Sequence, residues 1–476
     1  MKVKNTIWVL MLSISSCYIH KINKNPKPPV QIPKNFMSIK TGTPLKTMWW
    51  NEFNDKDLKT IIEIGLKTNF DIKAGIQRLK QAVAIAKKAG APLFPTISLE
   101  GNASKTKQIF MGGKPFGNMS FTNNQFSLSV ISSYELDIWR KVSSLKNASL
   151  EDIKATEFDI EALKLTIAAQ IATTYFNLKE AISQKELILS QIKTSKKLLD
   201  LLKLRFAKGL ATALDVYEQA EQLAALEALL PPVEENIELL KNEISVLCGY
   251  PPGKLDLKNI KKDLPNLPQF PDSGVPSQLL LNRPDLKAEK SRLLAIDWRI
   301  GAQLAEFLPT IRLSAKGGTQ SNKLSTLFDD LIWSIASSIT APIFQGGRIR
   351  ADLEYKKAQY AEKLENFAKK FINAVKEVEN AILQERQKNK YIKRIEKKLL
   401  ASKNTLEEAK RRYFTGLTDF IPVLRALSTF QSTQRELIKA KKDLITTRIK
   451  LYQALGNPWK RNKKLIAKGY KNEEGS

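Results

Sequence analysis

The sequence predicts an α+β membrane protein with an internal duplication, built from a long coiled-coil-like helical barrel and four β-strands per chain. Three observations lead to this prediction. Two stretches of the chain resemble one another, two long stretches lack proline, and four short segments alternate apolar with polar residues. After the N-terminus, no apolar run reaches the roughly 18 residues that a membrane-spanning helix needs. The chain is therefore either soluble or crosses a membrane with strands, whose alternation escapes hydropathy scans.

The duplication is visible in two alignments of the chain with itself. Residues 69–99 align without a gap with residues 283–313, at an offset of 214 positions. Residues 205–210 align with residues 412–417, at an offset of 207. The change in offset indicates a small length difference in a loop, so the chain repeats a unit of about 200 residues. Matched positions include Asp71/Asp285, Arg78/Arg292, Pro95/Pro309, Gly209/Gly416 and Gly249/Gly456.

Two stretches are predicted to form very long helices. Residues 140–205 and the matching residues 347–412 contain no proline. At 1.5 Å per residue, such a stretch makes a helix about 100 Å long. Apolar steps of three and four over this length are typical of coiled coils. In the first stretch the steps fall at Ile160, Leu163, Ile167, Ile171, Tyr175, Leu178 and Ile182.

A third helical stretch, residues 212–248, contains Pro231-Pro232. Proline inside a helix removes a hydrogen bond and clashes with the preceding turn, so this helix is expected to break or kink. The prolines mark either the level at which a helical wall bends or simply the junction of two shorter helices.

Four short segments alternate with the period of two that a strand between lipid and water requires. The stretches between them, Lys105–Asn124 and Gly317–Asp330, contain Gly, Asn and Ser and are expected to be hairpin loops. A half-buried hairpin in a soluble domain would show the same period, so the strands alone leave both interpretations open. The segments are Ile97–Ser104, Phe126–Val130, Ile311–Lys316 and Trp333–Thr340.

The long helices favour the membrane interpretation. Soluble proteins with helices of this length are filament-forming coiled coils, and those lack paired β-hairpins between their helices. Four strands cannot close a membrane barrel, since the smallest barrels have about eight strands and lipid does not tolerate open sheet edges. The barrel must then be shared between chains. Three copies would supply twelve strands, and the helices would continue the same wall as a long tube.

The N-terminus is typical of a bacterial lipoprotein. Lys2 and Lys4 form a basic region, residues 6–14 are mostly apolar, and Ile14-Ser15-Ser16-Cys17 matches a lipobox. Cys17 is therefore the predicted lipid anchor; the alternatives are an ordinary cleaved signal or a buried apolar N-terminus. The expected organisation is a signal peptide over 1–16, a tether over 17–45, a first repeat over 46–250, a Pro-rich linker over 251–275, a second repeat over 276–459 and a basic tail over 460–476.

The net charge of +29 raises the question of a nucleic-acid partner. The lysines are spread along the whole chain among Glu and Asp residues, and no zinc-finger spacing or RNA-binding signature is present. We interpret the charge as solvated helix faces and expect no nucleic acid as a partner. Such a charge also suits a neighbourhood of anionic lipid head groups.

Catalysis has little support in the sequence. His20 is the only histidine and lies in the expected tether, which excludes histidine-based triads and multi-histidine metal sites. The chain has no P-loop sequence, so it is not an ATP-driven motor of that kind. We expect no enzymatic activity, no cofactor and no metal.

A set of short motifs occurs in order along the chain: Trp49-Trp50, Asp57-Leu58, Leu93–Ile97, Ser133–Trp139, Arg283–Asp285, Phe307–Ile311, Ala341–Arg348, Arg412–Leu417, Leu451–Gly456 and Trp459. With this set the chain resembles the TolC-like outer-membrane factors, specifically their lipoprotein (NodT-like) branch. Each motif is weak alone, but the ordered set from about residue 46 to residue 459 is specific.

The resemblance implies a homotrimer in the outer membrane of a Gram-negative bacterium, with a twelve-stranded barrel, a helical tunnel in the periplasm and an equatorial collar. It implies docking to a periplasmic adaptor protein, which links the channel to a proton-driven inner-membrane transporter. The expected function is passive export of drugs or metals. The alternatives are the channel of a type I protein secretion system and a structural coiled-coil lipoprotein of the periplasm.

The resemblance also implies a tunnel that closes at its periplasmic tip, where the turns Lys203–Asp215 and Arg411–Phe420 meet. The family commonly has an acidic residue directly after the Gly-Leu of the second turn, whereas this chain has Thr418 there and Asp419 next. We expect the glycines to reverse the chain direction and arginine–aspartate pairs to hold the tip shut; the alternative is that these residues merely cap helices. The expected gate residues are Arg205, Asp215, Arg412, Leu417, Thr418 and Asp419, with turn glycines Gly209 and Gly416.

Overall fold

The computed structural model of the chain describes residues 20–37, 48–110, 119–257, 260, 262–272 and 274–456. The chain divides into two compact units, and each unit draws segments from both halves of the sequence. Unit 1 contains Met1–Pro29, Arg78–Glu157 and Ala288–Phe367, and unit 2 contains Val30–Gln77, Phe158–Lys287 and Ala368–Ser476. Among the described helices, none combines the length and the apolar character needed to cross a membrane.

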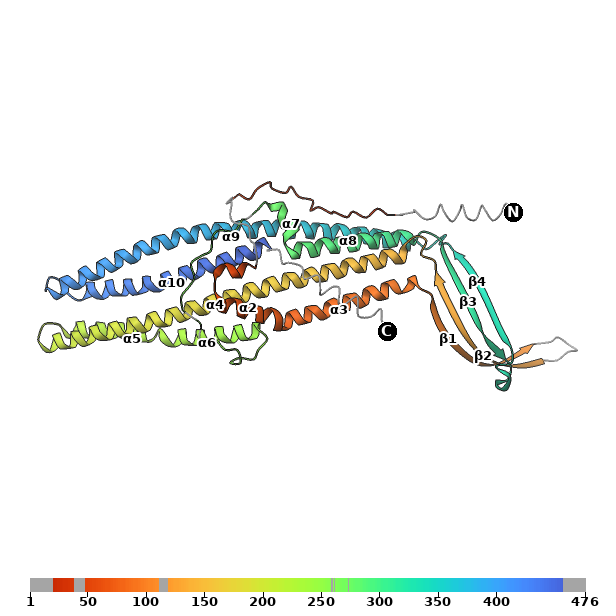
Figure 1. The fold of residues 1–476 in the computed structure, drawn as a ribbon, viewed down its shortest axis with the longest axis horizontal. Helices are drawn as coiled ribbons and strands as arrows, with labels where there is room; N and C mark the ends of the chain where they lie inside the picture. Colours follow the sequence, from red (N-terminus) through yellow and green to blue (C-terminus); the bar gives the residue numbers. More distant parts are fainter. Residues whose placement is uncertain are drawn as a thin grey trace. The chain divides into compact units, whose positions relative to one another are not determined.

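Unit 1 contains one antiparallel sheet of four strands in the order β1-β2-β3-β4 (Figure 1). The β1–β2 ladder runs from Thr96 opposite Ser133 to the far ends of both strands. The β2–β3 ladder stops at Phe126 opposite Ser321, so the first hairpin continues beyond the end of β3. The strands are β1 (Thr96–Phe110), β2 (Met119–Glu135), β3 (Thr310–Ser321) and β4 (Leu331–Thr340).

The sequence predicted the starts of β1 and β3 to within one residue, but the expected loop bounds were wrong. Lys105–Phe110 and Met119–Asn124 are paired strand residues, as are Gly317–Ser321. Gly, Asn and Ser are disfavoured in strands by about 1 kcal/mol or less each. A continuous antiparallel ladder satisfies every backbone group in between, and this outweighs the weak local preference.

Short connections join the strands to the helices that precede and follow them in the sequence. α3 (Phe70–Gly90) leads through η2 (Ala91–Leu93) into β1, and β2 leads into α4 (Lys141–Ala207). α8 (Pro284–Ala305) leads into β3, and β4 leads into α9 (Arg348–Phe414). In each half of the sequence, one hairpin of the sheet thus lies between two helices in chain order.

The connection from β2 to α4 is fixed by side chains of the Ser133–Trp139 motif. The Asp137 carboxylate accepts hydrogen bonds from the backbone N–H groups of Val142 and Ser143, at 2.9 and 2.8 Å. The Trp139 indole N–H donates to the carbonyl of Pro309, at 2.7 Å. Asp137 therefore satisfies free N–H groups in the first turn of α4, and Trp139 ties the two hairpins together at their bases.

Unit 2 is helical. Both long helices are confirmed, because α4 and α9 each span 67 residues; the first part of each belongs to unit 1 and the rest to unit 2. The expected interruption at Pro231-Pro232 is a junction of two helices: α5 ends at Glu227, and both prolines lie in the first turn of the next helix, where a missing N–H costs little. The further elements are η1 (Trp49–Phe53), α2 (Lys56–Thr68), α5 (Ala213–Glu227), α6 (Leu230–Leu247), η3 (Pro276–Gln278), α7 (Leu279–Asn282), η4 (Leu324–Thr326, in unit 1) and α10 (Ile421–Leu455).

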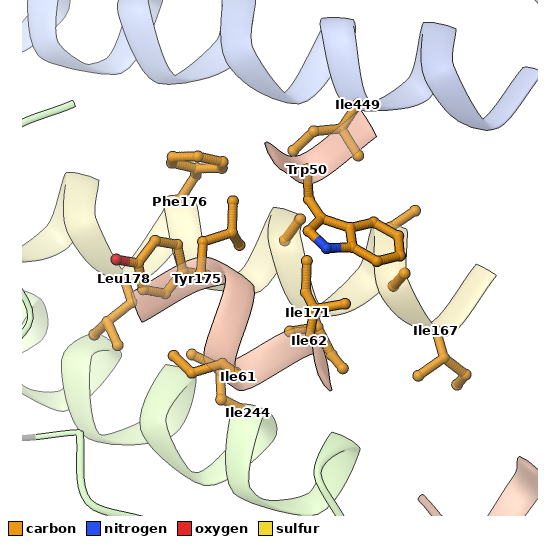
Figure 2. Close-up of a cluster of buried hydrophobic side chains, with 14 of the residues drawn as sticks. Trp50, Ile61, Ile62, Ile167, Ile171, Tyr175, Phe176, Leu178, Ile244 and Ile449 are labelled. Atoms are coloured by element: carbon orange, nitrogen blue, oxygen red, sulfur yellow. The ribbon is translucent and has the colours of Figure 1, made fainter. Parts of the chain in front are cut away.

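The core of unit 2 forms where side chains of η1, α2, α4, α6 and α10 meet (Figure 2). Trp49 stacks on Tyr452 with 5.6 Å between ring centroids, and Phe53 contacts Phe176 at 5.2 Å. We call these four residues the aromatic core. Each is at most 3% exposed, and burial of one such side chain contributes about 1.5–3 kcal/mol.

A partly buried carboxylate fixes the start of α2 beside this core. Asp55 accepts hydrogen bonds from the backbone N–H groups of Asp57 and Leu58, from the Tyr175 hydroxyl at 3.0 Å and from the Lys179 ammonium at 2.9 Å. Burial alone would raise the pKa of Asp55, but these hydrogen bonds and the Lys179 charge hold that pKa below its usual value. Asp55 is therefore an ionised helix cap with a buried counter-charge.

A second buried ion pair fixes the Pro-rich linker. The Arg448 guanidinium binds both oxygens of the Glu385 carboxylate, at 2.7 and 2.6 Å. It also donates to the carbonyls of Pro268 and Gln269, both at 2.8 Å, and lies over the Phe270 ring. Arg448 is 2% exposed and Glu385 is 4% exposed. Four charge-assisted hydrogen bonds thus hold one segment of the linker against α9 and α10.

Cys248, at the end of α6, is buried in the same unit. Its Sγ lies 3.5 Å from the Ile61 carbonyl oxygen, and burial raises the pKa of the thiol to about 11. A thiol with this pKa is almost entirely protonated at neutral pH and is therefore a poor nucleophile.

Candidate functional site

The two turns predicted to form the gate have the same backbone structure. Gly209 has φ +68° and Gly416 has φ +74°. The N–H of Leu210 donates to the Arg205 carbonyl at 2.8 Å, and the N–H of Leu417 donates to the Arg412 carbonyl at 2.9 Å. This is the hydrogen-bond pattern of a helix that ends at a left-handed glycine.

The role of the two turn glycines is therefore the expected one. A Cβ added at Gly209 or Gly416 would meet nothing within 4 Å, so space does not explain the glycines. The positive φ does, because a side chain is strained in that conformation.

The helices that follow the two turns begin differently. α5 begins with a capping box, in which Thr212 and Asp215 each bind the other's backbone N–H at 3.2 Å. α10 has no side-chain cap; it has Pro422 in its first turn and buries Phe420. Asp215 is therefore a helix cap, as the alternative interpretation held, and the oxygen that accepts from Thr212, Oδ2, makes one further contact.

That further contact joins the two turns. The Tyr413 hydroxyl donates to Oδ2 of Asp215, at 3.2 Å. The Arg205 guanidinium lies over the rings of Tyr413 and Phe414, at 5.2 and 5.5 Å from their centroids. Burial, followed by the negative charge of Asp215, raises the pKa of Tyr413, so the hydroxyl keeps its proton and stays a donor.

Arg412 points to its own helix. It binds Glu408 at 2.8 Å, and Arg411 binds the same carboxylate. The hydrogen bond from Arg412, followed by that from Arg411, lowers the pKa of Glu408. Within the described part of a single chain, neither predicted arginine forms an ion pair with Asp215 or Asp419. Pairs between neighbouring chains stay a prediction.

The remaining predicted gate residues lie at the surface of the second turn. Leu417 is 77% exposed, Asp419 is exposed and Thr418 is half-buried. Sequence reasoning missed Tyr413, although it is part of the Arg412–Leu417 motif, because no periodicity signals a contact across 198 positions. The buried residues that support both turns, which we call the tip cluster, are Leu202, Leu406, Ala409, Tyr413, Phe420, Val423, Ala426 and Leu427.

The predicted lipid anchor, Cys17, lies outside the described residues. The tether after it is described from His20 onward, and it binds α8. The His20 ring lies 2.6 Å from Oδ1 of Asp297, and the N–H of Asn23 donates to Oδ2 of the same carboxylate at 2.8 Å. A Cβ at Gly301 would lie 3.5 Å from His20 Cβ, so the His20 side chain packs closely against α8 at this glycine.

The four-stranded sheet has one apolar face and one polar face. Cross-strand pairing places Leu99 opposite Val130, and Gly317, on the same face of β3, opposite Trp333. The apolar side chains are exposed in the single chain: Leu99 is 70% and Trp333 is 74% exposed. Ser129 and Ser334 belong to the opposite face. An exposed apolar sheet face of this kind marks a contact with another apolar phase.

Comparison with known proteins places the chain in a family. The family of outer membrane efflux proteins matches residues 61–249 and 275–457. The pyoverdine export outer membrane protein OpmQ of Pseudomonas putida is 27% identical over 414 residues, which are 86% of this chain and 88% of OpmQ. The cation efflux system protein CusC of Escherichia coli is 25% identical over 457 residues, which are 94% of this chain and 97% of CusC.

A solved structure has the same fold. The outer-membrane channel OprN superposes with a TM-score of 0.85 at 24% identity, covering 94% of this chain and 100% of OprN. Together with the repeated turns and the four-stranded sheet, the match over both halves shows that the chain belongs to the outer membrane efflux protein family and is an efflux channel of the Gram-negative outer membrane.

Proposed function

We propose that the chain forms the trimeric outer-membrane channel of a tripartite efflux system. It conducts small molecules, drugs or metals, passively from the periplasm to the outside. The observation that carries this proposal is the sheet of unit 1, which has an exposed apolar face and two edge strands, β1 and β4, without a partner inside the described chain.

The edge strands support the trimer. Unpaired backbone groups cost several kcal/mol each in lipid, so a sheet that crosses a membrane must close on itself. Pairing β4 of one chain with β1 of the next satisfies both edges. Three chains then contribute twelve strands, with the apolar face toward lipid and the polar face toward the pore.

The energy for transport comes from partners. We propose that a periplasmic adaptor protein docks on the helical part and links it to a proton-driven transporter of the inner membrane. The channel itself performs no catalytic step. The names of OpmQ and CusC, an export protein and a cation efflux protein, support a transport role and small cargo rather than secreted protein.

The gate of this channel lies at the two turns that end α4 and α9. The Tyr413–Asp215 hydrogen bond holds the two turns of one chain together. Leu417 of three chains supplies an apolar constriction, and Arg205, Arg412, Thr418 and Asp419 form contacts between chains. Cys17 carries the lipid that anchors the mature N-terminus in the membrane.

The first test is the mass and the conductance of the purified protein. In mild detergent we expect the mass of three chains, and in a planar bilayer we expect discrete conductance steps. A monomer that retains full conductance would refute the shared barrel.

A pair of variants tests the orientation of the sheet. Ile335→Lys places a charge on the apolar face, and Ser334→Lys places the same charge on the polar face one residue away. The first should destabilise the membrane-inserted trimer by about 2–4 kcal/mol and the second by much less. Equal losses would argue against lipid on one face only.

A second pair of variants tests the gate. Arg412→Ala and Asp419→Ala should make the closed channel leak if these side chains pair between chains, and wild-type leakage should then rise with salt, because salt screens exposed ion pairs. Unchanged conductance in both variants would leave only the capping role.

A further inference from the structure

Two lysines interrupt the apolar face of β1, and Ile109, 60% exposed, follows them on the same face. Ile97 and Leu99 are 73% and 70% exposed on this face, and Gly101 and Ala103 continue it. The next two residues with the same side-chain direction are Lys105 and Lys107, both exposed strand residues. Because side chains alternate along a strand, all six positions lie on one face.

The neighbouring strand ends its apolar series at the same level. Phe126 is opposite Ala103 and is the last apolar residue of β2 on this face toward the hairpin end. Asn124 is opposite Lys105 and Thr122 is opposite Lys107. The apolar series of both strands therefore breaks off at the same level, and the two positive charges follow directly beyond that level.

Neither lysine has an anionic partner in the described chain. The sequence contains no Asp or Glu between Glu100 and Glu135, so the part of the hairpin that lies beyond Glu100 toward its end carries no acidic residue. Among the described residues, neither the Lys105 nor the Lys107 ammonium forms an ion pair or a side-chain hydrogen bond. By contrast, Arg312 at the other end of the sheet pairs with Glu135 at 3.3 Å. Two uncompensated cations on neighbouring positions of one face attract an anion from outside the chain.

We propose that Lys105 and Lys107 bind the phosphate groups of lipid in the outer leaflet of the membrane. The inference rests on the proposed function, because it requires the apolar face to contact lipid and the hairpin end to point away from the periplasmic helices. A lipid that covers Leu99 and Ala103 with its acyl chains places its phosphates at the level of the two lysines. The occupant is a phosphorylated lipid such as lipid A.

The chemistry favours a lipid over a free anion. An ammonium group is a compact point charge that binds phosphate without a fixed direction. Exposed lysines alone bind free phosphate weakly, whereas acyl chains on the adjacent apolar face hold the phosphates in place. Each lysine near an anionic lipid surface increases affinity roughly fivefold. The two lysines together therefore increase the affinity about 25-fold.

The experiment uses the full-length channel in phosphatidylcholine nanodiscs, titrated with lipid A and with lipid A whose phosphates have been removed. Bound lipid is counted by native mass spectrometry. The test variant is Lys105→Gln with Lys107→Gln. The matched control is Lys316→Gln, a lysine on the opposite face of the same sheet, opposite Ile131 on β2.

The wild type and the Lys316→Gln control should bind lipid A about 25-fold more tightly than the dephosphorylated lipid. The double variant should bind the two lipids equally. A double variant that keeps the wild-type preference overturns the proposal, and so does competition by inorganic phosphate at the concentration of lipid A.

Conductance in the same preparations separates this inference from the proposed function. Wild-type channels that conduct but show no preference for phosphorylated lipid refute only the lysine site. A protein that neither inserts nor conducts refutes the proposed function itself. The double variant should conduct like the wild type, since its substitutions face lipid and leave the pore unchanged.

Discussion

The aromatic core and the tip cluster belong to the same helical unit but are built differently. In the aromatic core, Trp49 and Tyr452 are each 1% exposed, and the partly buried Asp55 and the buried Glu385 beside it have cationic partners. The tip cluster is bounded by exposed apolar residues such as Leu417. Its two turns are joined by a hydrogen bond of 3.2 Å and by the Arg205 guanidinium over two aromatic rings. The comparison teaches that buried, charge-paired contacts are concentrated in the core, and that weaker contacts join the turns of the tip.

The largest effect is expected in the core. Arg448→Met leaves the Glu385 carboxylate buried without a counter-charge, and should lower the free energy of unfolding by about 3–5 kcal/mol. Thermal unfolding followed by circular dichroism in mild detergent measures the loss. The double variant Arg448→Met with Glu385→Leu should regain most of it. A double variant as unstable as the single one would contradict a role for the unpaired charge.

The next effect is a pH dependence of the core. The pKa of Asp55 is lowered in the folded state. Its contribution is therefore fully present above the unfolded pKa of about 4 and is lost as pH falls through the lower, folded pKa. Hydrogen bonds to a charged group contribute about 1.5–3 kcal/mol. Unfolding measured from pH 6 down to pH 2 should show this loss, and Asp55→Asn should flatten that part of the curve. An unchanged slope in the variant would assign the acid sensitivity to other groups.

A smaller effect is expected at the two turns. Gly209→Ala and Gly416→Ala should each cost about 1–2 kcal/mol, because alanine is strained at positive φ. The two losses should be similar, since the turns share one geometry. Gly317→Ala is the control: its added Cβ would also meet nothing within 4 Å, but its φ is not positive. A loss in the control as large as at the turns would refute the explanation from φ.

The smallest effect on stability, and the one most informative for function, is at Tyr413. Tyr413→Phe removes one partly exposed hydrogen bond to Asp215 and should cost about 0.5–1 kcal/mol. The closed channel should nevertheless leak more in a planar bilayer, because that bond joins the two turns. Tyr217→Phe, on an exposed tyrosine of α5, serves as the control. A Tyr413→Phe channel that stays as tight as the control would exclude the bond from the gate.

Local sequence patterns predicted the features of the fold that depend on neighbouring residues alone. The absence of proline predicted α4 and α9, alternation predicted four strands, and Gly209 and Gly416 predicted left-handed helix ends. Strand lengths were underestimated, because cross-strand pairing satisfies the backbone regardless of the weak preference of Lys105 or Asn124.

Contacts between segments far apart in the sequence could not be predicted from local patterns. Arg448 and Glu385 both lie on helices rich in charged residues, and nothing local distinguishes them from solvated neighbours. The Tyr413–Asp215 bond depends on how the two turns pack, which a hydrophobic period does not specify. Arginine near a helix end predicted an ion pair, but within one chain Arg412 binds Glu408 one turn away instead.

Cys248 gives the chain a practical property for spectroscopy. The sequence has only two cysteines; Cys17 is consumed by acylation if our proposal holds, and Cys248 is buried with a thiol pKa of about 11. A maleimide probe reacts with thiolate, so the native protein should be silent toward it near neutral pH. A single cysteine introduced at exposed Leu417 could then carry a spin label or a fluorophore without removal of any native residue. Distances between three such labels would report directly on the opening of the tip.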